Sequence, residues 1–327
     1  MRAVVCPRYG PPEVVRVEER PSPRPAPGQV RVRVDAAAVN YPDVLLIADR
    51  YQISVPPPFV PGSEFAGVID DINEPAGDVN VGDRVTGTGL YGAFAEEVVV
   101  ATAALSQIPV GIDPHAAAAF GVAHRTAYHT LRSVARVEAG DELVVLGAGG
   151  GVGLAAVQLG NQLGVSVTAV ASSGDKLAAA AAYGARRLVN YRSADLRSAL
   201  RDALPHGADA VIDPVGGDLS EPALRALSRG GRFVTVGYAS GVIPRIPLNL
   251  MLVKGVQLLG FQFQDIAQAE FRRNEHELRD LLATGRVAPH IGARFALTDC
   301  ASALRHVADG QAIGKVLIDI GPRFVTV

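Results

Sequence analysis

The sequence predicts an α/β protein of two domains, in which a β-rich part is followed by a part built on a parallel sheet. Three observations support this. The chain has 327 residues, enough for about two domains with two buried cores. Short predicted strands separated by Gly, Pro and Asp turns fill the first third. From about Ile112 onward, strands alternate regularly with helices, as in a parallel sheet covered on both faces.

The composition is that of an ordinary folded protein. The chain is 48% hydrophobic and 20% charged with a formal net charge of −2, whereas a disordered chain is less apolar and more charged. The small net charge gives no general attraction to nucleic acid or to an anionic membrane, so we expect neither partner. The longest non-polar run, residues 143–157, is too short to span a bilayer. The N-terminus has no recognisable secretory signal, and a cytoplasmic location is expected.

The first third is predicted to form a compact barrel or sandwich. Residues 21–29 are a proline-rich loop, expected to be extended and exposed. The next segment, VRVRVDAAAV at 30–39, alternates apolar and charged residues with the period of a half-buried strand. Short strands are also predicted around 64–69 and 96–100. Strands this short with frequent turns are typical of a closed β structure.

The second part is predicted to repeat a strand–helix unit. Its predicted strands are 142–146, 165–171, 186–190, 209–213, 232–237 and 255–261, and its predicted helices are 152–164, 175–184 and segments near 193–203 and 217–228. The strands are almost continuously apolar, as expected when both faces of a sheet are covered. From about Gln264 the chain returns to mixed helix and strand.

A glycine-rich turn gives the strongest chemical signal. In ELVVLGAGGGVGLAAVQLG, residues 142–160, a buried strand leads through glycines directly into a helix. This geometry directs unpaired N–H groups and the positive end of the helix dipole toward a phosphate. Gly149, Gly150 and Gly151 would allow a pyrophosphate to approach, and Gly153 would let the helix pack near the strand. Because the flanking strand and helix are both present, we interpret the turn as a dinucleotide site.

The tip of the next strand favours NADPH over NADH. An NAD site usually carries an acidic residue there, about 20 residues onward, for the ribose 2′-hydroxyl. Strand 165–171 is followed instead by Ser172 and Ser173, and then by Lys176, one of three lysines in the chain. Hydroxyls and a cation suit a 2′-phosphate. The alternative is that Ser173 and Asp175 only cap the helix while Lys176 is solvated.

Several motifs occur in the order and spacing of a known superfamily. They include AAAVNYPDVLL, VPGSEFAGVI, VGDRV, LGAGGGVGLAAVQLG, VIDPVGG and GKVLI. The chain resembles the medium-chain dehydrogenase/reductase superfamily over essentially residues 1–320, and within it the zinc-free quinone oxidoreductase branch. The resemblance implies a GroES-like catalytic domain formed by residues 1–121 and 263–327. A Rossmann NADP-binding domain, residues 122–262, is inserted between them.

The resemblance also bears on metal binding. Zinc-dependent relatives carry a cysteine ligand in the segment that contains Asn40 here, and a GHE motif where this chain has Gly62-Ser63-Glu64. The two cysteines, Cys6 and Cys300, cannot supply a four-cysteine zinc site. We therefore expect no metal. Without a Lewis acid an alcohol is a poor substrate, which leaves acceptors that are already electrophilic, such as quinones.

The resemblance implies roles for individual residues. Asn40, with Asp43 beside it in an N-x-x-D pattern, and Thr126 would lie near the nicotinamide, and Tyr51 would offer its hydroxyl to a carbonyl oxygen. The implied cofactor-binding residues are Asn40, Thr126, Gly149, Gly150, Gly151, Val152, Gly153, Ser172, Ser173, Lys176, Tyr191 and Gly237. Simpler interpretations remain for some of them: Asp43 as a first-turn carboxylate, Thr126 bonded to its own helix, and Tyr191 as a strand-end aromatic.

His124 departs from the family pattern, which has small or apolar residues before the threonine. It is either a proton relay facing the active site or, as we favour for a histidine at the start of a helix, a structural residue.

The resulting hypothesis is an NADPH-dependent oxidoreductase that transfers a hydride to a quinone or a similar activated carbonyl. The alternatives are an enone or enoyl-thioester reductase and, less favoured, a non-enzymatic crystallin-like or RNA-binding relative. An aromatic content of 6% argues against RNA binding. In the family, the strand matching residues 255–261 pairs with a second subunit, so a homodimer is expected, which would also cover an apolar edge.

Overall fold

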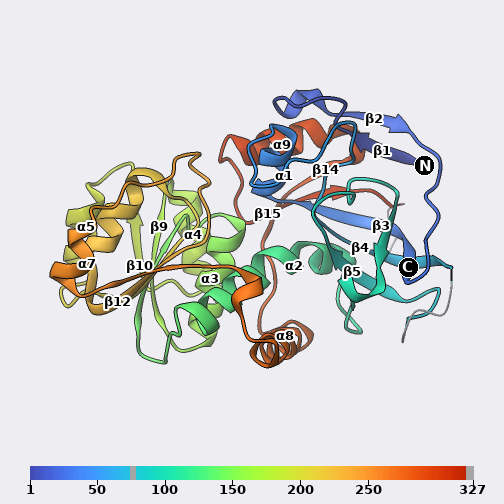
Figure 1. Ribbon diagram of the computed structural model, residues 1–327. Coiled ribbons are helices and arrows are strands. Elements are labelled where there is room, and N and C mark those ends of the chain that lie inside the picture. Colours follow the sequence, from blue (N-terminus) through green and yellow to red (C-terminus); the bar gives the residue numbers. More distant parts are fainter. Residues whose placement is uncertain (74–78, 322–327) are drawn as a thin grey trace. The chain divides into compact units, whose positions relative to one another are not determined.

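The computed structural model describes residues 1–73 and 79–321 and divides into two compact units (Figure 1). Unit 1 contains Met1–Val122 and Pro289–Val327, and unit 2 contains Ala123–Ala288. The predicted fold class is confirmed, since unit 1 is a β-rich domain formed by both ends of the chain and unit 2 is built on a parallel sheet.

The second boundary differs from the sequence prediction. The chain was expected to return to the first domain at residue 263, whereas it returns at Pro289. The reason is helix α8 (Gln268–Ala283), which is held within unit 2 by side-chain hydrogen bonds with α2 (Pro114–His129). Glu275 of α8 accepts hydrogen bonds from Arg125 at 2.9 Å and from His129 at 2.8 Å. Residues 322–327 of the predicted return segment lie outside the described residues.

Unit 1 is built around a long central strand, β3 (Gln29–Val39). This strand pairs antiparallel with β4 (Glu64–Ile72), β6 (Glu97–Ala101) and β15 (Lys315–Asp319). The remaining elements are β1 (Arg2–Val5), β2 (Arg16–Glu19), β5 (Arg84–Thr88), β7 (Leu105–Gln107), β14 (Ile291–Ala296), α1 (Tyr41–Ile47), α9 (Cys300–Ala308) and the start of α2 (Pro114–His129). The predicted strands at 30–39, 64–69 and 96–100 are therefore confirmed to within a few residues.

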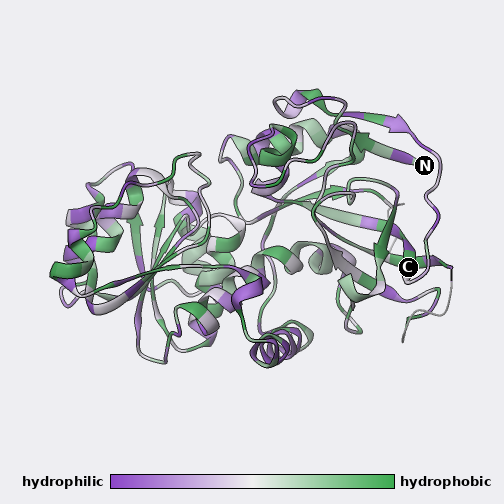
Figure 2. Ribbon diagram, in the orientation of Figure 1, coloured by the Kyte–Doolittle hydropathy of each residue, from purple (hydrophilic) through white to green (hydrophobic). Residues whose placement is uncertain are grey.

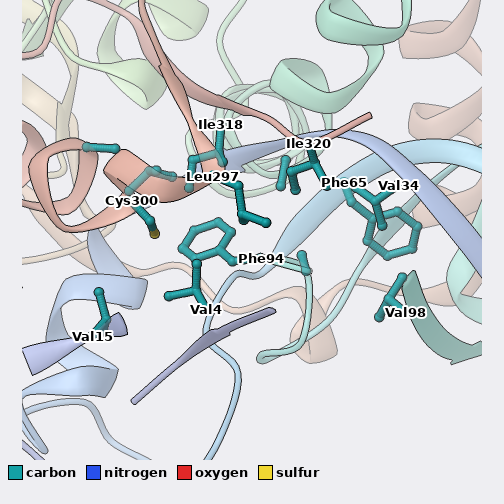
Figure 3. Close-up of a cluster of buried hydrophobic side chains, with 14 of the residues drawn as sticks. Val4, Val15, Val34, Phe65, Phe94, Val98, Leu297, Cys300, Ile318 and Ile320 are labelled. Atoms are coloured by element: carbon teal, nitrogen blue, oxygen red, sulfur yellow. The ribbon is translucent and has the colours of Figure 1, made fainter. Parts of the chain in front are cut away.

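The core of unit 1 gathers side chains from both chain ends. Figure 3 shows Phe94 and Val4 from the N-terminal part beside Cys300 and Leu297 from the C-terminal part. Cys300 is buried, and burial raises the pKa of its thiol far above the usual range. The thiol therefore behaves as a small apolar group in this core.

Unit 2 contains a six-stranded parallel sheet in the order β10-β9-β8-β11-β12-β13. The strands are β8 (Glu142–Leu146), β9 (Ser166–Ala171), β10 (Arg187–Asn190), β11 (Ala208–Asp213), β12 (Leu227–Thr235) and β13 (Gln257–Gly260), and the remaining helices are α3 (Gly151–Gln162), α4 (Gly174–Ala182), α5 (Leu196–Ala203), α6 (Ser220–Arg225) and α7 (Asn249–Lys254). The strand order reverses between β8 and β11. In open α/β sheets, ligands bind at the carboxyl ends of the strands beside such a reversal.

Hydropathy follows this architecture. In Figure 2 the strands of the parallel sheet are mostly hydrophobic, whereas α8 is strongly hydrophilic. No helix among the described residues is long and apolar enough to cross a membrane.

Candidate functional site

The loop between β8 and α3 is shaped by glycine. A Cβ atom at Gly153 would lie 2.1 Å from the carbonyl oxygen of Gly147, and one at Gly149 would lie 2.5 Å from the Cβ of Lys176. A larger residue at Gly153 would require the loop to move, and one at Gly149 would require Lys176 to move. Gly150 is the N-cap of α3 and provides no side chain to satisfy the first N–H groups of that helix. These groups are therefore suited to bind a phosphate.

Two cations follow neighbouring strands of the sheet: Lys176 in the first turn of α4 after β9, and Arg192 after β10. Ser173 caps α4, accepting the backbone N–H of Lys176 at 3.4 Å. The Lys176 side chain is half-buried, and its pKa is lowered by burial and by the nearby charge of Arg192. Ser172 lies at the same tip, whereas Asp175 is exposed. The sequence argument missed Arg192, although it directly follows the predicted Tyr191.

Two further predicted cofactor residues follow strand ends. Tyr191 comes just after β10, donates its N–H to the carbonyl of Ala171 at 3.2 Å and packs on the apolar cluster of unit 2. Gly237 follows β12 and donates its N–H to the carbonyl of Asp213. The carboxylate of Asp213 is fully buried and accepts the N–H groups of Val215 and Gly216, both at 2.8 Å. Asp213 therefore orders the turn after β11 rather than facing a ligand.

His124 and Thr126 both lie on α2. The sequence predicts His124 at the start of a helix, but it lies in the middle of α2. It is buried, and its Nε2 lies 3.2 Å from the amide oxygen of Gln158 on α3. This contact favours a structural role in joining the two helices. The carbonyl of Thr126 accepts the hydroxyl of Thr130 at 2.7 Å.

The other predicted residues lie in unit 1, where Asn40 belongs to a buried polar cluster. Its amide oxygen accepts the ammonium of Lys315 at 2.6 Å, and its amide nitrogen donates to Glu64 at 2.9 Å and to Ser63 at 3.1 Å. Lys315 also pairs with Glu64 at 2.5 Å, and both side chains are buried. We call Asn40, Asp43, Ser63, Glu64 and Lys315 the Lys315 cluster.

Asp43 completes this cluster from the first turn of α1. One carboxylate oxygen accepts the backbone N–H of Asn40 at 2.7 Å. Burial raises the pKa of Asp43 to about 7, and hydrogen bonds from Asn40 and Ser63 and the charge of Lys315 oppose the rise. The capping role agrees with the simpler interpretation of Asp43.

Tyr51 follows α1 and is half-buried against the core of unit 1. No residue in the ranges 1–73 and 79–321 forms a hydrogen bond with its hydroxyl. By contrast, the hydroxyl of nearby Tyr9 donates to the carbonyl of Val55 at 3.0 Å. The fold of unit 1 therefore does not depend on a hydrogen bond from the Tyr51 hydroxyl.

Both parts of the chain are similar in sequence to known proteins. Residues 26–110 match a family model described as an alcohol dehydrogenase GroES-like domain, and residues 151–280 match one described as a zinc-binding dehydrogenase. Quinone oxidoreductase-like protein 2 of Bos taurus is 35% identical over 325 residues, covering 98% of this chain and 92% of that protein. Quinone oxidoreductase of Homo sapiens is 30% identical over 322 residues, covering 97% of each chain.

The chain belongs to the quinone oxidoreductase family of the medium-chain dehydrogenases/reductases. It is therefore an oxidoreductase by family. A solved structure agrees with this assignment: Escherichia coli quinone oxidoreductase, determined in complex with NADPH, matches with a TM-score of 0.90 at 25% identity, over 98% of this chain and 100% of that one.

The name of one matched model raises the question of zinc, and the residues of this family member do not fit a metal ion. At the positions that correspond to the cysteine and the histidine of zinc-dependent relatives stand Asn40 and Ser63; the amide oxygen of Asn40 accepts the ammonium of Lys315, and its amide nitrogen donates to the hydroxyl of Ser63. Among the residues in the described ranges, no group of three or more His, Cys, Asp and Glu side chains could hold a metal. A zinc ion would have to displace a buried cation.

The predicted site residues thus fall into two groups. Unit 2 gathers the glycine loop, Val152 at the start of α3 and the basic tip of β9, while unit 1 gathers Asn40, Asp43 and Tyr51. Sequence reasoning did not place Glu64 and Lys315 beside Asn40. The available signal was a lysine in the otherwise apolar strand KVLI, in a chain that uses arginine almost everywhere else.

Proposed function

We propose that this protein is an NADPH-dependent, metal-independent oxidoreductase that transfers a hydride to a quinone or a similar activated carbonyl acceptor. The observation that carries the cofactor choice is the end of β9, where the positive charge of Arg192 acts on Lys176 and no carboxylate follows the strand directly. Two cations and the hydroxyls of Ser172 and Ser173 match a 2′-phosphate dianion, which a carboxylate would repel.

The residues of the chain would bind and orient the reactants. The uncapped start of α3 would bind the pyrophosphate through backbone N–H groups. When bound, NADPH supplies the hydride. The hydroxyl of Tyr51 would donate a hydrogen bond to the acceptor oxygen as negative charge develops there. Because Asn40 and Ser63 stand at the positions of the usual metal ligands and the amide of Asn40 is bonded to the ammonium of Lys315, the acceptor must be electrophilic without help from a Lewis acid.

The test is to compare kcat/KM for NADPH and NADH over a panel of quinones, enones and crotonyl-CoA, with metal content measured on the same sample. We expect turnover with quinones, a preference for NADPH and no stoichiometric metal. Turnover of crotonyl-CoA well above that of every quinone would favour the enoyl-thioester alternative. Absence of NADPH oxidation with every acceptor would refute the proposal.

Lys176→Ala tests the cofactor assignment directly. Losing one charge-assisted hydrogen bond to the 2′-phosphate should lower kcat/KM for NADPH by about 10- to 100-fold and leave the value for NADH nearly unchanged. Arg201→Ala is the matched control, because Arg201 is an exposed cation of α5 that pairs with neighbouring Asp202. An unchanged NADPH preference in Lys176→Ala would overturn the assignment.

We also propose that the protein is a homodimer joined through β13. This strand forms one edge of the parallel sheet, so one of its sides has no partner strand within the described chain. Leu258 on β13 is 43% exposed, and Leu252 and Val253 on the preceding helix are 84% and 70% exposed. An exposed apolar edge favours pairing with a second copy of the same strand.

A further inference from the structure

The Lys315 cluster places charged groups where water cannot reach them. The side chains of Lys315 and Glu64 are 4% and 0% exposed. Buried charges persist only when they are paired and hydrogen-bonded, and removing one partner is strongly unfavourable. The ammonium of Lys315 is satisfied by Glu64 at 2.5 Å and Asn40 at 2.6 Å. The cluster therefore joins β15, β4 and the end of β3.

The cluster permits only one orientation of the Asn40 amide. Lys315 can only donate hydrogen bonds and therefore must face the amide oxygen of Asn40. Ionised Glu64 can only accept and therefore must face the amide nitrogen. If the amide were turned over, its nitrogen would meet the ammonium and its oxygen would meet the carboxylate.

Glu64 is itself held from a second side. Its other carboxylate oxygen accepts the backbone N–H of Val122 in α2 at 2.7 Å. Gly121 leaves room for this approach, because a Cβ atom there would lie 3.1 Å from the same oxygen, a tight contact. The Glu64 carboxylate is therefore held in place by Val122 on one side and by Lys315 on the other, and it holds the amide nitrogen of Asn40 in turn.

We propose that Lys315 is a positioning residue for hydride transfer, which acts by holding the amide of Asn40 in this single orientation. The inference rests on the proposed function, because it takes Asn40 as part of the surface against which the cofactor and acceptor lie. Lys315 is buried with its ammonium on Asn40 and Glu64, so the proposal gives it no direct contact with these reactants. Its removal should therefore lower kcat and leave cofactor binding nearly unchanged.

The pKa of Asp43 provides a measure of the same cluster that does not depend on enzyme activity. The charged or titratable groups that face Asp43 are Lys315 on β15, Glu64 on β4 and the thiol of Cys300 on α9, with the Ser63 hydroxyl beside them. Lys315 lowers the pKa of Asp43 and Glu64 raises it. Lys315→Met should therefore raise the pKa of Asp43, and Glu64→Gln should lower it.

The experiment compares Lys315→Met with the double variant Lys315→Met/Glu64→Gln. The single variant leaves a buried carboxylate unpaired and should lose thermal stability, whereas the double variant removes both charges and should regain most of it. In the double variant the new amide both donates and accepts hydrogen bonds, so Asn40 is no longer held in one orientation. We expect kcat to remain about 10- to 100-fold below wild type, as when a reacting geometry is loosened, with the Kd for NADPH within about 3-fold.

Arg294→Met is the matched control. It removes an exposed cation from the neighbouring strand β14 of the same sheet and should leave kcat, NADPH binding and the Asp43 pKa unchanged. The Asp43 pKa is followed by ¹³C-carboxyl NMR in the protein without cofactor.

Recovery of kcat together with stability in the double variant would show that Lys315 is only a counter-ion and would overturn the inference. An Asp43 pKa that does not change in Lys315→Met would also overturn it. If the wild-type protein fails to oxidise NADPH with every acceptor, the proposed function fails instead. The two failures are therefore distinguishable.

Discussion

At the residue scale, the candidate chemistry of unit 1 depends on burial. Asp43 is 1% exposed, and one of its carboxylate oxygens has no hydrogen-bond partner among the described residues. Transfer of a carboxylate out of water disfavours the charged form, which is why the pKa of Asp43 rises to about 7 despite the nearby ammonium of Lys315. Asp43 therefore holds its proton over a pH range in which exposed carboxylates are ionised.

The raised pKa predicts a pH-dependent stability. Between the usual pKa of 3.8 and the folded value of about 7, the folded protein binds more protons than the unfolded chain. The stabilising contribution of Asp43 to the free energy of unfolding is fully present below pH 4 and is lost as the pH rises toward 7. Above pH 7 the free energy of unfolding no longer changes because of Asp43. Asp43→Asn should abolish this pH dependence. In the wild type, the total change in the free energy of unfolding over this pH range is on the order of 4 kcal/mol.

Urea unfolding at several pH values between 4 and 8 measures the effect. Asp202→Asn is the control, because Asp202 lies at an exposed position of α5. If Asp43→Asn and wild type lose stability in parallel over this range, the assignment of the slope to Asp43 is wrong.

Residue-scale prediction from sequence succeeded only where neighbours in the chain decide the geometry. Asn40 and Asp43 are three positions apart, and the N-x-x-D pattern already allows their capping contact. Lys315 lies 275 positions from Asn40. No local pattern connects them, so the most highly charged part of the candidate site was missed.

At the element scale, the glycine loop is the part of the site that the sequence predicted best. Strand, loop and helix are contiguous in the chain, and each has a strong local preference. The structure adds the reason for each glycine. Gly153 is required because of the carbonyl of Gly147, and Gly149 because the stem of Lys176 packs against it.

Gly153→Ala should therefore be destabilising, although alanine is the better helix former by about 1 kcal/mol. Its Cβ atom would overlap the Gly147 carbonyl at 2.1 Å, so the loop must shift. We expect a net loss of about 1–3 kcal/mol in the free energy of unfolding and weaker NADPH binding.

Gly174→Ala is the matched control for this substitution. Gly174 begins α4, and a Cβ atom there meets no heavy atom within 4 Å. Chemical denaturation and fluorescence titration with NADPH provide the two measurements. Wild-type stability in Gly153→Ala would contradict the close packing of the loop.

Helix α8 shows where element-scale prediction failed. Its sequence is strongly polar, and nothing in its own pattern indicates the domain to which it belongs. Helix α8 belongs to unit 2 because Arg125 and His129 of α2 both pair with its Glu275. His129 also stacks on Phe271 of α8, with ring centroids 4.7 Å apart. These contacts place the helix in unit 2.

At the scale of the whole molecule, the proposed dimer depends on one edge of a sheet. The two edges of the parallel sheet are β13 and β10. Leu258→Lys introduces a charge into the β13 edge and should convert the dimer to a monomer, since a buried unpaired charge at an interface is strongly unfavourable.

Leu188→Lys is the control for the dimer, because Leu188 is a comparably exposed leucine on β10 at the opposite edge. This variant should remain dimeric. Sedimentation velocity at micromolar concentration distinguishes the two states. A monomeric wild type, or a dimer that persists in Leu258→Lys, would refute pairing through β13.

The sequence by itself determined the two-domain α/β fold, the strand–helix repeat and the glycine loop, because these depend on hydrophobic period, turn residues and neighbours in the chain. The tertiary structure alone decided that the chain returns to unit 1 at Pro289, that Arg192 lies near Lys176 and that Lys315 joins Asn40 to Glu64. The contact between Arg125 and Glu275 and those of Lys315 join residues 150 to 275 positions apart in the sequence. Such contacts follow from how the elements pack, which local patterns do not specify.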